Sequence, residues 1–182
     1  MAQNKLYFTI GLPRSGKSTE CNQWLSNYND IYKNAFIRVP KENIFTSPSK
    51  NKVVVTPDRW RLAMGHRYNW FSEPLVFSQV QIAIRALLMD YDVLVDDTHT
   101  TVESVKRILE VEPDAIPIPI KTDPAICKGR ALNTGQRDLI PVIDRMSVNM
   151  FTLYGTKFEK LDTVMQDLRT EVLSHSSRKI VV

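Results

Sequence analysis

The chain has 182 residues, of which 43% are hydrophobic and 24% charged, and its formal net charge is +4. This length can bury one hydrophobic core but leaves little room for a second catalytic domain, so we expect a single domain over residues 1–182. No run of 18 apolar residues and no signal peptide is visible in it, which predicts a cytoplasmic protein that does not span or enter a membrane.

Along the chain, strand-like and helix-like patterns alternate, which predicts an α/β fold with a central parallel sheet flanked by helices. The expected strands cover residues 6–10, 53–56, 93–96 and 116–121. The expected helices cover residues 17–28, 58–64, 75–90, 102–110, 124–133, 141–153 and 157–174. We interpret residues 29–52, where prolines and lysines are scattered among isolated apolar residues, as an insertion at the surface or a mobile arm. Residues 179–182 could form a short edge strand or a frayed end.

Directly after the first expected strand, residues 11–18 read GLPRSGKS and match the phosphate-binding loop pattern G-x-x-x-x-G-K-[ST] at every constrained position. The glycines let the backbone turn tightly, so that N–H groups point at phosphate oxygens at the start of the next helix. Lys17 could then reach the β- and γ-phosphates, and the Ser18 hydroxyl could bind Mg2+. The pattern predicts a nucleoside triphosphate site. The residues assigned to this site are Gly11, Leu12, Pro13, Arg14, Ser15, Gly16, Lys17, Ser18 and Thr19.

The second expected strand is followed by PDRWR, which contains Asp58 and Arg61. Ligands of open α/β sheets bind outside the carboxyl ends of the strands, so Asp58 is expected near the phosphates. There it could accept the proton of an attacking hydroxyl group, as a general base does. It could equally be the N-cap of a helix that begins at Arg59. Arg61, one turn further on, could bind a phosphate of the acceptor.

The third expected strand leads into two acids, Asp96 and Asp97. A short apolar strand that ends in an acid, downstream of a phosphate-binding loop, is typical of the carboxylate that reaches the Mg2+ shell. We assign this role to Asp96 and keep Asp97 as the alternative. His99 follows directly and is interpreted as a surface or capping residue.

A further basic segment contains Lys128, Gly129, Arg130 and Arg137 and precedes a helix that we expect to open at Pro141. Small nucleotide kinases build a lid from such a segment, and the arginines of the lid neutralise charge that develops on the transferred phosphate. We therefore predict a lid over residues 126–141. A solvated basic loop has the same composition.

These four motifs, GLPRSGKST, PDRWR, VLVDDT and GRALNTGQRDLIP in this order, resemble the 5'-kinase domain of bacteriophage-type polynucleotide kinase. The resemblance covers residues 5–154 and implies a P-loop kinase fold with a central parallel sheet and a helical lid. The implied activity is the ATP-dependent, Mg2+-requiring transfer of a γ-phosphate to the 5'-hydroxyl of a nucleic-acid end, RNA or DNA. The phosphatase motif of the bifunctional members does not occur in this sequence, so the resemblance implies a kinase alone.

By position, the resemblance also implies roles for single residues. Asp58 would activate the 5'-hydroxyl group, Arg61 would contact a phosphate of the acceptor, and Asp97 could orient Arg61. Arg130 and Arg137 would belong to the lid. The residues thus assigned to catalysis are Lys17, Asp58, Arg130 and Arg137.

Two other functions share parts of this pattern. A kinase of the same superfamily that acts on a sugar, a nucleoside or a related metabolite would have the same loop, base and lid. A nucleotide-binding module without catalysis would have the loop, but such a module needs no base beside an acceptor, so Asp58 argues against it.

Overall fold

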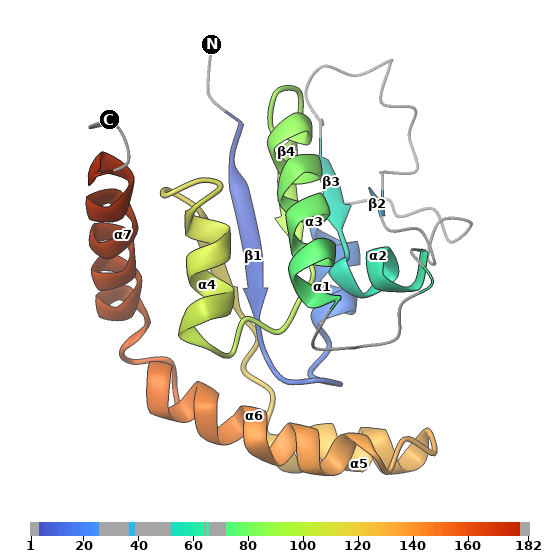
Figure 1. Ribbon diagram of the computed structural model, residues 1–182. Helices are drawn as coiled ribbons and strands as arrows, with labels where there is room; N and C mark the ends of the chain where they lie inside the picture. Colours follow the sequence, from blue (N-terminus) through green and yellow to red (C-terminus); the bar gives the residue numbers. More distant parts are fainter. Residues whose placement is uncertain (1–3, 26–36, 39–51, 64, 66–71, 179–182) are drawn as a thin grey trace. The chain divides into compact units, whose positions relative to one another are not determined.

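The structure is a computed structural model that describes residues 4–25, 37–38, 52–63, 65 and 72–178 (Figure 1). The chain divides into two compact units. Unit 1 comprises Met1–Phe8 and Ser18–Asp97, and unit 2 comprises Thr9–Lys17 and Thr98–Val182. The expected single domain stays a prediction. Within the described ranges, no helix is both long enough and apolar enough to cross a membrane.

Unit 1 contains most of the sheet. β3 (Lys52–Val55) and β4 (Asp92–Val95) are parallel, and β4 is also parallel to β1 (Leu6–Ile10). β2 (Ile37–Arg38) pairs with β3 in the antiparallel direction. The strands read as continuous apolar runs because helices cover a parallel sheet on both faces. The buried apolar residues of β1, β3 and β4 in this unit are Leu6, Phe8, Val53, Val54, Val55, Val93, Leu94 and Val95.

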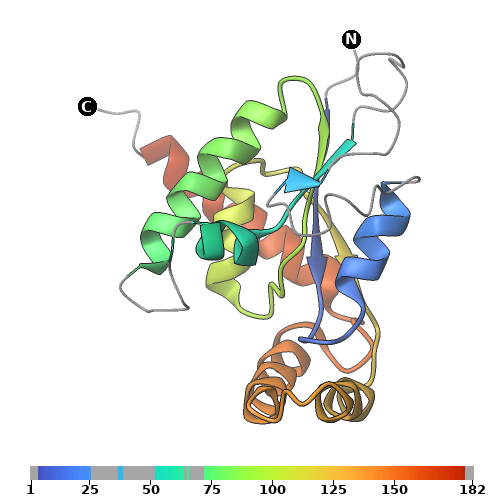
Figure 2. The same ribbon diagram turned by 90° about the vertical axis from the view of Figure 1, so that its right-hand side faces the viewer.

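Three helices of this part of the chain follow the strands: α1 (Lys17–Trp24), α2 (Pro57–Ala63) and α3 (Glu73–Leu87). Val76, Val80 and Ile84 form the buried face of α3 and recur at the spacing of one side of a helix. α3 packs against β3 and β4, and the short α2 lies against α3 (Figure 2). The end of β3 therefore delivers α2 next to the first turn of α3.

Unit 2 contains the end of β1 and β5 (Ile116–Pro119), which follows it in the strand order β2-β3-β4-β1-β5. Just beyond β5, the N–H of Ile120 donates to the carbonyl oxygen of Ile10 at 2.8 Å. α4 (Val102–Leu109) lies beside the C-terminal helix α7 (Leu161–Arg178), as Figure 1 shows. Apolar residues that are buried where these helices pack are Val105, Ile108, Leu109, Leu161, Met165, Leu168 and Val172.

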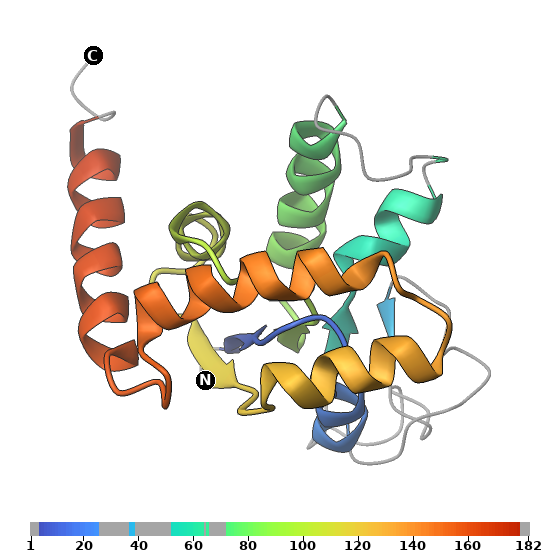
Figure 3. The same cartoon turned by 90° about the horizontal axis from the view of Figure 1, so that it is seen from below.

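The remaining two helices of unit 2, α5 (Pro124–Asn133) and α6 (Leu139–Tyr154), run side by side (Figure 3). α5 begins where the sequence predicts it, because the Asp123 side chain accepts the N–H of Ala125 at 2.7 Å and Pro124 occupies the first turn. At the end of α6, the buried Tyr154 hydroxyl donates to the carbonyl oxygen of His99 at 3.1 Å. This bond ties α6 to the segment after β4.

The fold class is confirmed: this is an α/β fold with a central parallel sheet flanked by helices. Two helices begin two residues earlier than predicted, each just before a proline. α3 begins at Glu73 rather than residue 75, and α6 begins at Leu139 rather than at Pro141. A proline has no backbone N–H, and the N–H groups of the first helical turn have no partner within the helix. A proline therefore fits anywhere in the first turn and does not mark the first residue of the helix.

Two further differences concern single segments. α7 begins at Leu161 rather than residue 157, because Gly155 and Phe158 have φ angles of 81° and 61° and form a turn that no helix can include. β2 was missed, since its two residues lie in the predicted insertion 29–52. Residue 52 of the predicted insertion belongs to β3, whereas residues 29–36 and 39–51 and the tail 179–182 lie outside the described residues.

Candidate active site

The predicted phosphate-binding loop follows β1 and leads into α1, which is the context that the pattern requires. In unit 2 the loop is stabilised by one bond within the loop and one bond from Thr122. The Lys17 ammonium donates to the carbonyl oxygen of Leu12 at 2.7 Å, and the Thr122 hydroxyl donates to the carbonyl oxygen of Ser15 at 2.7 Å. Gly16 has φ of +101°, a conformation that favours glycine. The loop is therefore folded into its compact shape by contacts within unit 2.

Arg14, in the middle of the loop, makes one hydrogen bond with Arg130 of α5 and one with Thr134, the residue that follows α5. Its Nη2 donates to the Thr134 hydroxyl oxygen at 2.5 Å, and the Nη1 of Arg130 donates to the Arg14 carbonyl oxygen at 3.0 Å. The Arg130 side chain is exposed, and one of its nitrogens lies near Gly16. The structure thus brings Arg130 to the loop, as expected for a cation that contacts phosphates.

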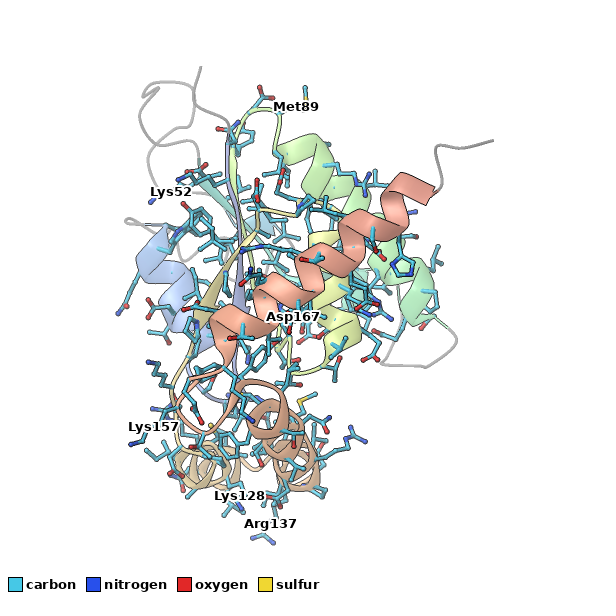
Figure 4. All side chains as sticks on the ribbon, turned by 90° about the vertical axis from the view of Figure 1, so that its left-hand side faces the viewer. Lys52, Met89, Lys128, Arg137, Lys157 and Asp167 are labelled. Atoms are coloured by element: carbon cyan, nitrogen blue, oxygen red, sulfur yellow. The ribbon has the colours of Figure 1, made fainter. Side chains whose placement is uncertain are left out.

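Most of the basic segment is helical. Lys128, Gly129 and Arg130 lie within α5, the helix that the sequence predicts over residues 124–133; proline at the start and few β-branched residues favour this helix. Arg137 does lie in the turn between α5 and α6. Its side chain is exposed and points away from both helices in Figure 4. The structure therefore brings Arg130, but not Arg137, toward the phosphate-binding loop.

In unit 1, Ser18, the residue after Lys17, contacts Asp96, the acid that follows β4. The Ser18 hydroxyl donates to Oδ2 of Asp96 at 2.9 Å, and Asp96 is buried. A hydroxyl oxygen and a carboxylate oxygen in contact are the kind of ligands that Mg2+ takes, usually together with waters and phosphates. Within the described residues, no group of three or more His, Cys, Asp or Glu side chains forms a complete metal site. Ser18 and Asp96 thus fit a cation whose other ligands come from water or phosphate.

Also in unit 1, Asp58, Arg61 and Glu73 form one ion-paired cluster. Arg61 donates from Nε to Oε1 of Glu73 at 2.5 Å and from Nη2 to Oε2 at 2.9 Å, which is a two-bond fork. Its Nη1 donates to Oδ1 of Asp58. Arg61 and Glu73 are buried, each 8% exposed, whereas the Asp58 side chain has 76% of its area exposed. The cluster is therefore a buried ion pair that holds an accessible carboxylate.

The position of Asp58 removes one alternative. α2 begins at Pro57, so Asp58 is the second helical residue and not an N-cap. Desolvation raises the pKa of Asp58 above its ordinary value, and the negative charges of Asp97 and Asp96 raise it further, whereas Arg61 lowers it. Opposing effects of this kind occur around carboxyl groups that exchange protons in active sites.

Glu73 is the member of this cluster that the sequence did not reveal. It is 12 residues from Arg61, beyond the reach of the i to i+4 rule, and an acid in a first helical turn is ordinarily explained by the helix dipole. Asp97 was expected to orient Arg61. Desolvation lowers the pKa of Arg61, but Glu73, Asp58 and Asp97 raise it, so that the pKa lies above its ordinary value. The two-bond fork, however, comes from Glu73.

His99 is not the surface residue that the sequence suggested. It is 1% exposed, and its Nδ1 lies 2.8 Å from the carbonyl oxygen of Thr9. The ring of His99 contacts Thr9, and its carbonyl oxygen accepts from Tyr154. Together with a φ of +42°, these two contacts fix the turn after β4 within unit 2. Sequence inspection gave no sign of this, because a polar residue in a loop is exposed more often than buried.

Comparisons with known proteins bear on the fold. No protein-family model and no curated protein matches the chain. Among solved structures, a chain in the structure of the Pnkp1/Rnl/Hen1 complex is similar, with a TM-score of 0.54 and 20% sequence identity. The match covers 71% of this chain and 40% of that chain. At this identity, the likeness supports the α/β fold that the sheet order and the flanking helices already define.

Proposed function

We propose that this chain is a phosphotransferase that moves the γ-phosphate of ATP to the 5'-hydroxyl group at the end of a nucleic acid. The observation that carries the proposal is the cluster around Asp58, in which a buried Arg61–Glu73 pair holds an accessible carboxylate directly after a strand of the parallel sheet. A module that only bound nucleotide would have no use for such a carboxylate. Its accessibility fits a group that must meet a substrate.

The phosphate donor would be bound by the loop. Backbone N–H groups at the start of α1 suit the β- and γ-phosphates, and Lys17 would leave the Leu12 carbonyl oxygen to pair with them. Arg130 already contacts the loop through the Arg14 carbonyl oxygen, so a small side-chain rotation would bring its charge to a phosphate. Both cations would stabilise negative charge during transfer.

Mg2+ is the cation we assign to Ser18 and Asp96, because their oxygen atoms are in contact and Asp96, rather than Asp97, carries that bond. When bound, Mg2+ would neutralise charge on the triphosphate. The part of the protein is to present one hydroxyl and one carboxylate oxygen at the start of α1.

Asp58 would act as the general base. It would accept the proton of the acceptor hydroxyl as that oxygen forms a bond to the γ-phosphorus and the bond from this phosphorus to the β,γ-bridging oxygen breaks, which releases ADP. Its raised pKa makes the carboxylate a stronger base than an ordinary aspartate. The role requires the ionised form, so activity should fall as the pH decreases through this pKa.

Nucleic acid as the acceptor is supported by three observations of different weight. The order of four motifs resembles polynucleotide 5'-kinases, the fold is similar to that of a chain in the Pnkp1/Rnl/Hen1 complex, and the net charge is +4. A small-molecule acceptor is the second candidate. It is favoured by the burial of Arg61, because the arginine expected to bind an acceptor phosphate is already engaged by two carboxylates.

The experiment is a transfer assay with γ-labelled ATP and Mg2+ and a panel of acceptors: 5'-hydroxyl RNA and DNA oligonucleotides, nucleosides, 3'-phosphonucleosides and sugars. Label on the oligonucleotides, lost in Asp58→Asn, is the expected result. Label on a sugar or nucleoside alone would assign the second candidate. Label on none of them, with ATP bound, would overturn the phosphotransferase proposal.

A further inference from the structure

In unit 1, the guanidinium group of Arg61 is shared by two carboxylates, those of Glu73 and Asp58. Glu73 accepts from Nε and Nη2 along one edge of Arg61, and Asp58 accepts from Nη1. The guanidinium group is planar and its five donors have fixed directions, so binding along one edge fixes the direction in which Nη1 points. The direction of the bond to Asp58 is thus set by Glu73.

Asp58 depends on such a bond because packing does not hold it. Its side chain has 76% of its area exposed, so no wall of neighbouring atoms selects one orientation of the carboxylate. Arg61 and Glu73 are each 8% exposed and come from two helices, α2 and α3, that pack together. A buried pair therefore holds a carboxylate whose side chain is largely exposed.

We propose that Glu73 is a positioning residue, which locks Arg61 so that Arg61 holds the Asp58 carboxylate in the orientation for proton transfer. The inference rests on the proposed function and assigns Arg61 to the base, in place of the acceptor phosphate. Charge explains why the lock is needed. The acids near Arg61 are Asp58 on α2, Asp96 and Asp97 after β4, and Glu73 on α3, and all of them act on the charge of Asp58 or Arg61. Without Glu73, Arg61 would be shared between Asp58 and Asp97, the other two acids that act on its charge.

Glu73→Gln tests this directly, since it keeps the shape and one acceptor atom but removes the charge. We expect kcat to fall about 10²-fold, as for displacement of a reacting group by about 1 Å, with little change in KM for ATP or acceptor. Arg61 lowers the pKa of Asp58, so weaker contact raises that pKa, and the acid limb of the kcat profile should move to higher pH. Glu73→Asp should restore part of both effects. Glu103→Gln, which removes one exposed negative charge from α4, is the matched control and should behave as wild type.

The readout that does not depend on turnover is the titration of the Asp58 carboxyl carbon by NMR, where Glu73→Gln should raise the pKa. This separates the inference from the proposed function: a wild type that transfers no phosphate refutes the function, while the shift in titration still supports the lock. An acid limb and a titration that do not move would overturn the inference, and so would a raised acceptor KM at unchanged kcat. If Glu73→Gln fails to fold, wild type decides: an Arg61 Nε–H that exchanges with solvent as fast as that of the exposed Arg130 contradicts the lock.

Discussion

Arg61 and Arg130 are the same residue type in two different settings. Arg130 in unit 2 is exposed and reaches the loop through one bond to a backbone carbonyl oxygen. Arg61 in unit 1 is buried and is bound by two carboxylates. A weakly held, exposed arginine can rotate toward an incoming phosphate, whereas a fully paired one is already committed to its neighbours. The role of a basic residue near a motif is therefore predicted better from the groups that it contacts than from its position in the sequence.

The largest effect should come from the loop of unit 2. Lys17→Ala should lower phosphate transfer by at least about 10³-fold, because water cannot replace a cation beside transferring charge. Steady-state turnover and circular dichroism of the same samples provide the measurement. Lys157→Ala, an exposed lysine of unit 2 that is labelled in Figure 4, is the control and should retain activity. Near-normal turnover in a folded Lys17→Ala would remove the kinase assignment.

The second effect concerns the accessible carboxylate of unit 1. Asp58→Asn should lower kcat by roughly 10²- to 10⁴-fold with the KM for ATP little changed, because the amide keeps the shape but accepts no proton. The same loss is expected in Asp58→Ala. The wild-type profile should lose activity as the pH falls through the raised pKa of Asp58, and the acid limb should be absent from the residual activity of Asp58→Asn. An active Asn variant would exclude Asp58 as the base.

The third prediction separates the two arginines, Arg130 and Arg137, that the sequence assigns to a lid. Arg130→Ala should lower kcat by about 10²-fold, the effect of losing one donor to developing charge. Arg137→Ala should have a much smaller effect, because Arg137 points away from α5 and α6 while Arg130 contacts the loop. Single-turnover rates of both variants at saturating ATP make the comparison. Equal losses would mean that the sequence assignment of both arginines to catalysis was right and that the turn before α6 moves during the reaction.

The smallest effect is expected for salt and acceptor length. If phosphates of a nucleic acid contact the protein, KM should be lower for a 5'-hydroxyl oligonucleotide than for a nucleoside, and this advantage should shrink as salt is raised. We expect Arg61→Lys to leave the salt dependence unchanged while lowering kcat, because we assign Arg61 to Asp58. KM values at two salt concentrations, with matched nucleoside and oligonucleotide, provide the test. A flatter salt dependence in Arg61→Lys would return Arg61 to the acceptor phosphate.

The sequence predicted the parts of this structure that depend on local chemistry. The order of strands and helices, the burial of β3 and β4, and the start of α5 at Pro124 follow from short patterns with one physical reading. The Arg61–Glu73 pair and the bond from Tyr154 to His99 join residues 12 and 55 positions apart. The spacing of apolar residues along the sequence does not predict contacts of this kind. The roles of Asp58, Arg130 and Arg137 stay predictions until they are measured.

The Arg61–Glu73 pair also has a consequence for how this protein could change in evolution. It joins the last part of α2 to the first turn of α3 and so closes the stretch of chain between them. The entropy of closing such a stretch grows slowly, by about 0.6 kcal/mol for each doubling of its length. Because the ion pair fixes both ends, insertions and substitutions between α2 and α3 should leave the orientation of Asp58 intact.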